Sequence, residues 1–176
     1  MNIVLIGMPG CGKSTIGVLL AKTMLCEFVD TDLIIQNKYK KSLCEIIAEE
    51  GLDAFKEKEN SVLRELQGEN CVIATGGSAV YCREGMENLM KNGKVVYLKL
   101  SPEEIKGRIK NIKTRGIAMK DGTTIDELFL ERAPLYEKYA DYTVECKNLS
   151  AEECVERIID IVRKLERSLS SLFHLW

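Results

Sequence analysis

Eight residues near the start of the chain constrain its fold more than any other feature. Residues 7–14 have the sequence GMPGCGKS, in which a glycine is followed by four residues and then by Gly-Lys-Ser. The apolar segment Ile3–Ile6 before them predicts a buried strand, and the residues from Thr15 to Leu20 are suited to begin a helix. A strand, a glycine-rich loop of this spacing and a helix are together typical of the phosphate-binding loop, or P-loop, of nucleotide-binding proteins.

The residue types in this loop suit the chemistry of a triphosphate. Glycines let backbone N–H groups converge on phosphate oxygens, and the N-terminus of the following helix adds a partial positive charge. We expect Lys13 to reach the β- and γ-phosphates and the Ser14 hydroxyl to bind Mg²⁺. The ATP-binding residues expected in this loop are Gly10, Cys11, Gly12, Lys13, Ser14 and Thr15.

The rest of the chain alternates short β-branched segments with helical patterns. Cys71–Ala74 and Val95–Leu98 predict buried strands, and Glu27–Val29 and Tyr142–Val144 are weaker candidates. Capping-box spacing predicts helix starts at three pairs: Ser42 with Glu45, Ser101 with Glu104, and Ser150 with Glu153. We therefore expect an α/β fold with three α/β/α layers and a five-stranded, mostly parallel sheet.

Length and composition indicate a single domain. The 176 residues are 45% apolar and 30% charged, and a chain of this length buries roughly 70% of its unfolded surface without disulfides. We expect one domain over residues 1–167, followed by a tail at 168–176. The seven cysteines are odd in number and contain no C-x-x-C, which favours reduced thiols in the cytoplasm.

The same composition argues against several classes of function. The net charge of −2 disfavours a nucleic-acid partner, and no apolar run approaches the ~18 residues of a membrane span. The one histidine, His174, stands third from the end of the sequence, which argues against histidine-based catalysis. Nothing marks a large apolar surface, so a monomer is the default expectation.

Two carboxylates follow the second expected strand. In an extended chain, the side chains of Asp30 and Asp32 point to the same side, and at the carboxyl end of a strand both would face the ligand crevice beside the P-loop. One could hold water on Mg²⁺, and the other could accept a proton from an attacking hydroxyl or orient it. Later in the chain, residues 112–124 lack an apolar period and carry two glycines and several charges, which is typical of a loop that is either disordered or functional.

The whole pattern resembles the shikimate kinase family, within the P-loop kinases of the nucleoside-monophosphate-kinase type. The resemblance extends from Gly7 to about Ser150. It rests on an ordered set of segments: GMPGCGKSTIG, FVDTD, AFKEKE, ATGG, Arg115, and RAPLY followed by Ala140-Asp141. It implies the phosphorylation of the 3-hydroxyl of shikimate by ATP to give shikimate 3-phosphate in aromatic amino acid biosynthesis, with Mg²⁺ as cofactor.

The resemblance also implies a role for each matching residue. Residues 112–124 would form a mobile lid that carries Arg115. Lys13, Asp32 and Arg115 would be catalytic, with Asp32 as the expected base. Asp30 would support Mg²⁺ through water, and Arg108 would lie against the adenine. The residues implied to bind the acid are Asp32, Lys56, Gly76, Gly77 and Arg132.

Three positions depart from the family pattern. Lys56 replaces an arginine, and lysine offers a carboxylate a point charge instead of a two-pronged fork. Ser78 replaces a third glycine, which could either tighten one backbone approach or cap the next helix. Gly116 replaces a proline, which would loosen the lid. Two alternatives therefore remain open at this stage: a related kinase for another hydroxy acid such as gluconate, or a non-catalytic nucleotide-binding protein.

Overall fold

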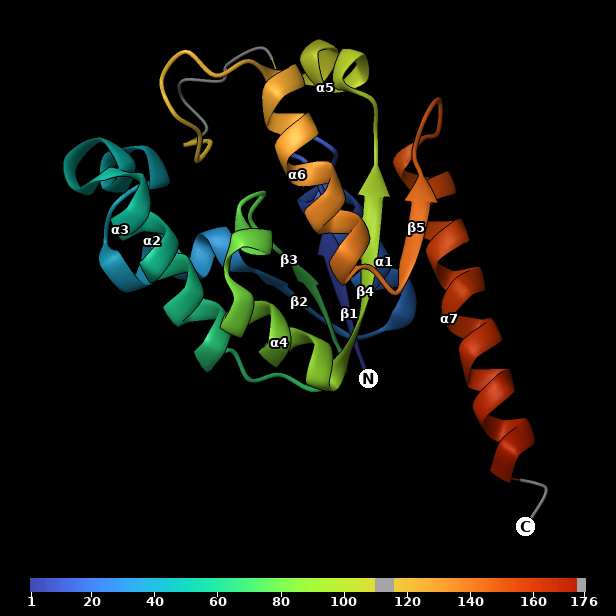
Figure 1. The fold of residues 1–176 in the computed structure, drawn as a ribbon. Helices are drawn as coiled ribbons and strands as arrows, with labels where there is room; N and C mark the ends of the chain where they lie inside the picture. Colours follow the sequence, from blue (N-terminus) through green and yellow to red (C-terminus); the bar gives the residue numbers. More distant parts are fainter. Residues whose placement is uncertain (110–115, 174–176) are drawn as a thin grey trace.

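The sheet of the protein runs through its centre. The computed structural model describes the backbone of residues 1–109 and 116–173 and the side chains of residues 1–109 and 116–164. Its strands are β1 (Asn2–Ile6), β2 (Glu27–Asp30), β3 (Cys71–Ala74), β4 (Gly93–Lys99) and β5 (Tyr142–Glu145). They lie in the order β2-β3-β1-β4-β5, and every neighbouring pair is parallel (Figure 1). The predicted five-stranded α/β sheet is confirmed, and the two weaker candidate strands form its edges.

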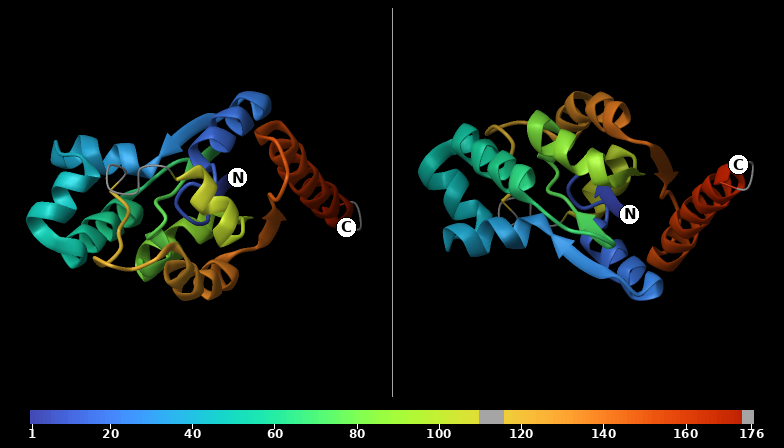
Figure 2. Two further views of the ribbon diagram at one scale, coloured as in Figure 1. Left: turned by 90° about the horizontal axis from the view of Figure 1, so that it is seen from above. Right: turned by 90° about the horizontal axis from the view of Figure 1, so that it is seen from below.

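Helices cover both faces of this sheet. They are α1 (Lys13–Met24), α2 (Thr31–Tyr39), α3 (Leu43–Glu65), η1 (Ala79–Tyr81), α4 (Arg83–Asn92), α5 (Pro102–Arg108), α6 (Ile125–Tyr139) and α7 (Ala151–Phe173). Helices α1 and α7 contact each other on one face, and α4 and α6 pack against β4 on the other (Figure 2). Capping boxes form at Ser42, Ser101 and Ser150 as expected, and a further one forms at Thr124.

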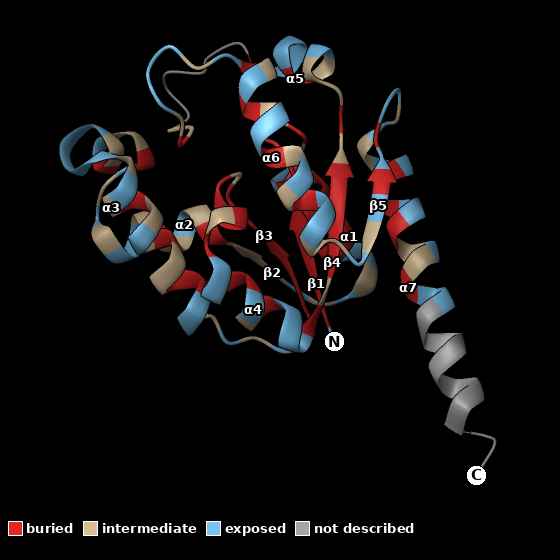
Figure 3. Cartoon of the chain, in the orientation of Figure 1, coloured by how far each residue is buried: buried red, intermediate tan, exposed pale blue. Residues whose placement is uncertain are grey.

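Burial follows from this layering. Strands β1 and β3 are buried along their whole length (Figure 3), because a parallel sheet covered on both faces exposes neither side. A second, smaller apolar cluster lies away from the sheet, between α2, α3 and the segment after residue 115. Its buried members are Ile35, Leu43, Ile46, Phe55, Val62 and Ala118.

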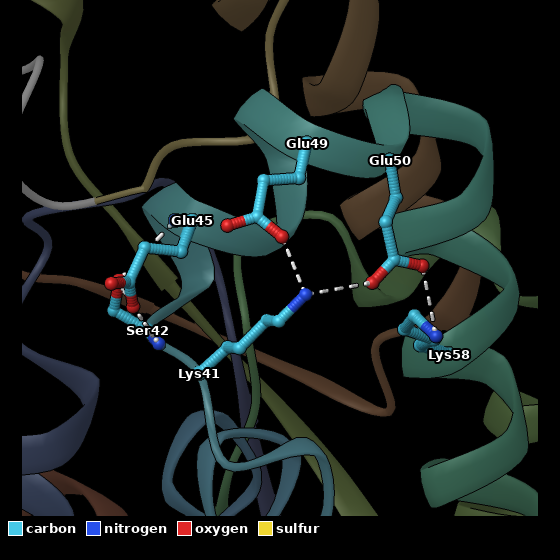
Figure 4. A network of polar contacts seen from close by, with 6 residues as sticks. All are labelled: Lys41, Ser42, Glu45, Glu49, Glu50 and Lys58. Carbon is cyan, nitrogen blue, oxygen red and sulfur yellow. Dashed lines mark hydrogen bonds and ion pairs between the residues drawn. The ribbon is translucent and has the colours of Figure 1, made fainter.

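Helix α3 bends at Gly51, whose φ of 87° and ψ of 169° break the helical path. Exposed ion pairs span the bend (Figure 4): Lys41 binds Glu49 and Glu50, and Glu50 Oε2 lies 3.1 Å from Lys58 Nζ. These ion pairs connect the start of α3 to its second half. Each such pair at the surface contributes little to stability, about 0–1 kcal/mol.

Helix α7 continues to Phe173, so the backbone of residues 168–173 extends this helix into the expected tail. The side chains from residue 165 onward, and His174, lie outside the described residues. None of the described helices combines the length and apolar character needed to cross a bilayer. The carboxyl ends of β1, β2 and β3 lie together at one end of the sheet (Figure 1). The loops that follow these strands form the candidate site.

Candidate active site

The P-loop connects β1 to α1 in the predicted way. Gly12 caps the helix with a φ of 101°, a left-handed conformation that suits glycine, and α1 begins at Lys13. The ammonium of Lys13 is folded back onto the loop, where it donates to Gly7 O at 2.7 Å and to Met8 O at 2.9 Å. The loop therefore already has a defined shape around its lysine.

A cavity opens beside the P-loop, and the expected ATP-binding residues differ in whether they line it. Five of them line it: Gly10, Gly12, Lys13, Ser14 and Thr15. Cys11 is fully buried and does not, although its carbonyl accepts a hydrogen bond from Arg108 Nη1 at 3.5 Å. Arg108 itself lines the cavity, so it lies next to the loop. Arg115 lies outside the described residues.

Asp30 and Asp32 are not arranged as the sequence predicted. Helix α2 begins at Thr31, so the two aspartates do not share an extended chain. Asp30 caps α2 by accepting from the Asp32 backbone N–H at 3.0 Å, and its other oxygen accepts from Ser14 Oγ at 2.7 Å. Asp32 lies in the first helical turn and lines the cavity. The expectation of parallel carboxylates is wrong, because an aspartate that caps a helix turns toward the helix N-terminus.

Asp32 has a second carboxylate beside it that was not predicted from the sequence. Glu59 is fully buried on α3, and its Oε2 accepts from Ser78 Oγ at 2.6 Å. The expectation that Ser78 caps the next helix is therefore wrong, since η1 has no side-chain cap. Within the described residues, Asp32 Oδ1 and Glu59 Oε1 are buried without a hydrogen-bond partner, and both approach Gly76.

Burial changes the acidity of both carboxyl groups. Loss of solvation, with a smaller contribution from the charge of Asp30, raises the pKa of Asp32 to about 6. Loss of solvation also raises the pKa of Glu59 to about 7, against the hydrogen bond from Ser78, which lowers it. Both groups therefore exchange protons near neutral pH.

Arg132 is the most deeply buried cation of the site, with 1% of its surface exposed. Its Nε donates to Tyr81 Oη at 3.2 Å, and its Nη2 donates to the carbonyl of Ala118. Among the described residues Nη1 has no partner, and this atom lies on the side of Gly77. Arg132 thus keeps one buried donor without a protein partner among the described residues, beside the Gly77 part of the cavity wall.

The remaining predicted substrate residues lie close by. Gly76 and Gly77 line the cavity, and the carbonyl of Gly77 accepts a hydrogen bond from Tyr136 Oη at 2.6 Å. Lys56 is half-buried and is not part of the cavity wall. Its Nζ lies 4.8 Å from the centre of the Tyr81 ring.

One cavity of about 670 Å³ joins these groups. Asp32, Arg132 and the Gly76–Gly77 turn share it with the P-loop. Its wall also contains residues that were not predicted from the sequence, among them Leu149, Ser150, Ala151 and Cys154. These residues lie where β5 leads into α7, beside the predicted helix start at Ser150. That position between a strand and a helix was the one signal in the sequence that could have placed them at the site.

The oxygen atoms beside the P-loop suit Mg²⁺, which prefers oxygen ligands and keeps several of its waters. Ser14 Oγ and Asp30 Oδ2 are already in hydrogen-bond contact at the N-terminus of α1. No group of three or more metal-binding side chains occurs in the described part of the chain. A Mg²⁺ bound here would be held by Ser14 directly and by Asp30 through a water, with phosphate oxygens supplying further ligands.

A P-loop at the edge of a parallel sheet, facing a buried carboxylate and an arginine across one cavity, defines a P-loop kinase for a small molecule. The sequence model of the family described as "Shikimate kinase" matches residues 9–163. The chain belongs to the shikimate kinase family, and the resemblance noted from its motifs is confirmed.

Individual relatives agree with this assignment. The chain is 36% identical over 166 residues to a shikimate kinase of Vibrio parahaemolyticus, covering 93% of this chain and 96% of the relative. It is 37% identical over 168 residues to that of Caldanaerobacter subterraneus, covering 94% and 98%. Among solved structures, a shikimate kinase of Acinetobacter baumannii in complex with shikimate matches with a TM-score of 0.86 and 32% identity, covering 93% of both chains. A gluconokinase of Sinorhizobium meliloti, at 16% identity and a TM-score of 0.53, shares only the fold.

Proposed function

We propose that this protein transfers the γ-phosphoryl group of ATP to the 3-hydroxyl of shikimate, giving ADP and shikimate 3-phosphate. The observation that carries this proposal is the shared cavity, because the P-loop, Asp32 and Arg132 all line it. A phosphate donor and a hydroxy acid can therefore meet in one enclosed space. The proposal adds a reaction and a position of transfer to the family membership established above.

The nucleotide side of the reaction is assigned to the P-loop. The backbone N–H groups at the start of α1 would bind the phosphates, and Lys13 would leave the carbonyls of Gly7 and Met8 to neutralise them. We assign the Mg²⁺ to Ser14, with Asp30 holding one of its waters. Bound Mg²⁺ would neutralise charge on the phosphate oxygens. Arg108 would lie against the adenine.

The acceptor side is assigned to the opposite wall. Asp32 would accept the hydrogen bond of the 3-hydroxyl and hold it in line with the γ-phosphate. Arg132 would bind the carboxylate of the acid through its free Nη1, with the Gly76–Gly77 turn beside it and Lys56 as the second cation. Arg115 is assigned to the developing phosphoryl charge on the basis of the family pattern alone.

Excluding water protects this reaction. Arg132 binds the carbonyl of Ala118, and Ala118 is buried in the apolar cluster of α2 and α3. The segment from Gly116 to Ala118 thus forms part of the cavity wall. A covered cavity favours transfer to the hydroxyl over hydrolysis of ATP. We also propose that the protein acts as a monomer in the cytoplasm.

An assay of ADP release with MgATP tests the proposal. We expect rapid release that depends on shikimate, together with formation of shikimate 3-phosphate detected by mass spectrometry. If ADP is released only with another acid such as gluconate, that acid and not shikimate is the substrate. If ATP binds tightly but its phosphoryl group is transferred to neither acid, the protein is a nucleotide-binding switch. Gel filtration with light scattering tests the monomer.

A further inference from the structure

Tyr81 stands between the two cations assigned to the acid. The Nζ of Lys56 lies 4.8 Å from the centre of its ring, and Cζ of Arg132 lies 5.2 Å from the same centre. Both distances are within the range of a cation–π interaction. A single aromatic ring on η1 therefore contacts one cation from α3 and one from α6.

The hydroxyl of Tyr81 is fixed in one orientation. It donates to Glu131 Oε1 at 2.6 Å and accepts from Arg132 Nε at 3.2 Å. Because its hydrogen is directed at the Glu131 carboxylate, a lone pair of the oxygen faces Arg132. The pKa of Tyr81 is raised by burial and by this carboxylate, so the hydroxyl keeps its hydrogen.

This hydrogen bond decides which donor of Arg132 is free. The guanidinium fork is rigid and planar, and two of its three nitrogens are held, Nε by Tyr81 and Nη2 by the carbonyl of Ala118. Nη1 remains, buried beside Gly77 and without a partner among the described residues. The contact with Tyr81 therefore directs Nη1 toward the acid.

Lys56 depends on the ring for a different reason. Its charge is carried on a flexible four-carbon stem, so it has no fixed geometry of its own. The same ring also contacts Arg132, so the two cations share it. The electron-rich face of the Tyr81 ring attracts the ammonium of Lys56 and so limits the positions that its flexible stem can take.

We propose that Tyr81 is a positioning residue for the acid-binding site. It holds Lys56 near the carboxylate and orients Arg132, and so gives a fixed place to a cation that has no rigid fork of its own. The inference rests on the proposed function, since it concerns the carboxylate of the same acid. Tyr81 itself does not contact the reacting atoms.

Replacing the ring with an aliphatic side chain tests the proposal. In Tyr81→Leu both cation–π contacts and the hydrogen bond are lost, and we expect the KM and the dissociation constant for shikimate to rise roughly tenfold or more. The KM for ATP stays within about twofold, because the P-loop is untouched. Steady-state kinetics and isothermal titration with shikimate measure both quantities.

Tyr39 supplies a matched control. Lys58 follows Lys56 by two residues on α3, and its Nζ lies 4.2 Å from the centre of the Tyr39 ring on α2. No cation–π contact joins the Tyr39 ring to Lys56 or Arg132 among the described residues. Tyr39→Leu therefore removes a similar contact away from the acid. We expect a comparable loss of thermal stability in both variants and an increase in shikimate KM only in Tyr81→Leu.

A double mutant separates positioning from packing. Once Lys56→Met has removed one cation, Tyr81→Leu has less left to disturb, so its effect on shikimate binding shrinks by several-fold. A purely structural role would give the same factor in both backgrounds. Tyr81→Phe keeps the ring and gives a smaller rise of roughly threefold to fivefold, and it serves if the leucine variant does not fold.

The outcomes distinguish this inference from the proposed function. If the unmodified protein releases no shikimate-dependent ADP, the function is overturned. If it turns over normally and the Tyr81 variants bind shikimate within twofold of it, only the role of Tyr81 is overturned. The same holds if Tyr81→Leu and Tyr39→Leu change shikimate KM equally.

Discussion

Asp32 and Glu59 meet across Gly76, each with one buried oxygen that has no hydrogen-bond partner in the described part of the chain. A Cβ on Gly76 would lie 2.8 Å from Asp32 Oδ1 and would overlap Glu59 Oε1. The absence of a side chain at this position is therefore what allows both carboxylates to lie against the same turn.

Gly76→Ala tests this close approach. The added methyl group displaces one or both carboxylates, and we expect a loss of about 1–3 kcal/mol in the free energy of unfolding and a large fall in kcat. Gly107→Ala on α5 is the control, because a Cβ added there would meet no atom within 4 Å, and no loss is expected. Thermal unfolding and the ADP assay measure the two effects. Equal stability of the two variants would contradict the assignment.

Glu59→Gln tests the buried acid through pH. With a native pKa raised from 4.5 to about 7, Glu59 keeps a proton that the unfolded chain releases from about pH 4.5 upward. Stability therefore falls as pH rises through this window. In the glutamine variant that fall is smaller, by on the order of 3 kcal/mol.

Urea unfolding at pH 5 and pH 8 gives this difference directly. Ser78 can still donate to a glutamine oxygen, so the hydrogen bond is kept. The exposed Glu57→Gln on the same helix should show the pH dependence of the unmodified protein. If Glu59→Gln also does so, the pKa of Glu59 is not raised in the native state.

Asp32→Asn tests the acceptor of the substrate hydroxyl. An amide can orient a hydroxyl but cannot take its proton, so we expect kcat to fall by about 10²–10⁴ while ATP still binds. ATP titration and single-turnover kinetics separate these two effects. Asp53→Asn, at an exposed position of α3, is the control. Near-normal turnover in Asp32→Asn would remove Asp32 from the mechanism.

Lys56→Arg tests the departure from the family pattern. A guanidinium can bind the carboxylate with two parallel hydrogen bonds, so we expect the KM for shikimate to fall by roughly threefold to tenfold. Lys56→Met should raise it, and Lys58→Arg, whose lysine pairs with Glu50, should leave it unchanged. A higher KM in Lys56→Arg would show that this residue does not bind the carboxylate.

The start of α3 allows a comparison of two kinds of stabilisation. Ser42 caps the helix and forms a complete capping box with Glu45, so Ser42→Ala should cost about 1 kcal/mol. Lys41 forms only exposed ion pairs (Figure 4), so Lys41→Met should cost about 0–1 kcal/mol and less at high salt. Urea unfolding at low and high salt shows which of the two variants loses more free energy of unfolding. A larger cost for Lys41→Met would make the network the dominant anchor.

Local patterns predicted the fold and the strand–loop–helix form of the P-loop. The strand before Gly7 and the capping box at Ser42 depend on residues that are neighbours in the sequence, and each forms as expected. The direction of Asp32 could not be predicted in this way. It depends on α2 starting at Thr31, which follows from the capping bond of Asp30.

Glu59 and Tyr81 were missed for a tertiary reason. Glu59 belongs to an alternating charged run that is typical of a solvated helix face, yet its spacing from Phe55 and Val62 places it on the buried face. Attention to that spacing would have identified it. Nothing local distinguishes Tyr81, because its partners come from α3 and α6 and meet it only in the folded chain.

The resting position of Lys13 has a consequence for the energetics of each catalytic cycle. Its ammonium is already stripped of most of its water and bound to two neutral carbonyls, those of Gly7 and Met8. The cost of dehydrating this charge is thus borne once, when the chain folds. An arriving triphosphate exchanges one set of acceptors for a more strongly charged set, and departing ADP returns the lysine to the same carbonyls.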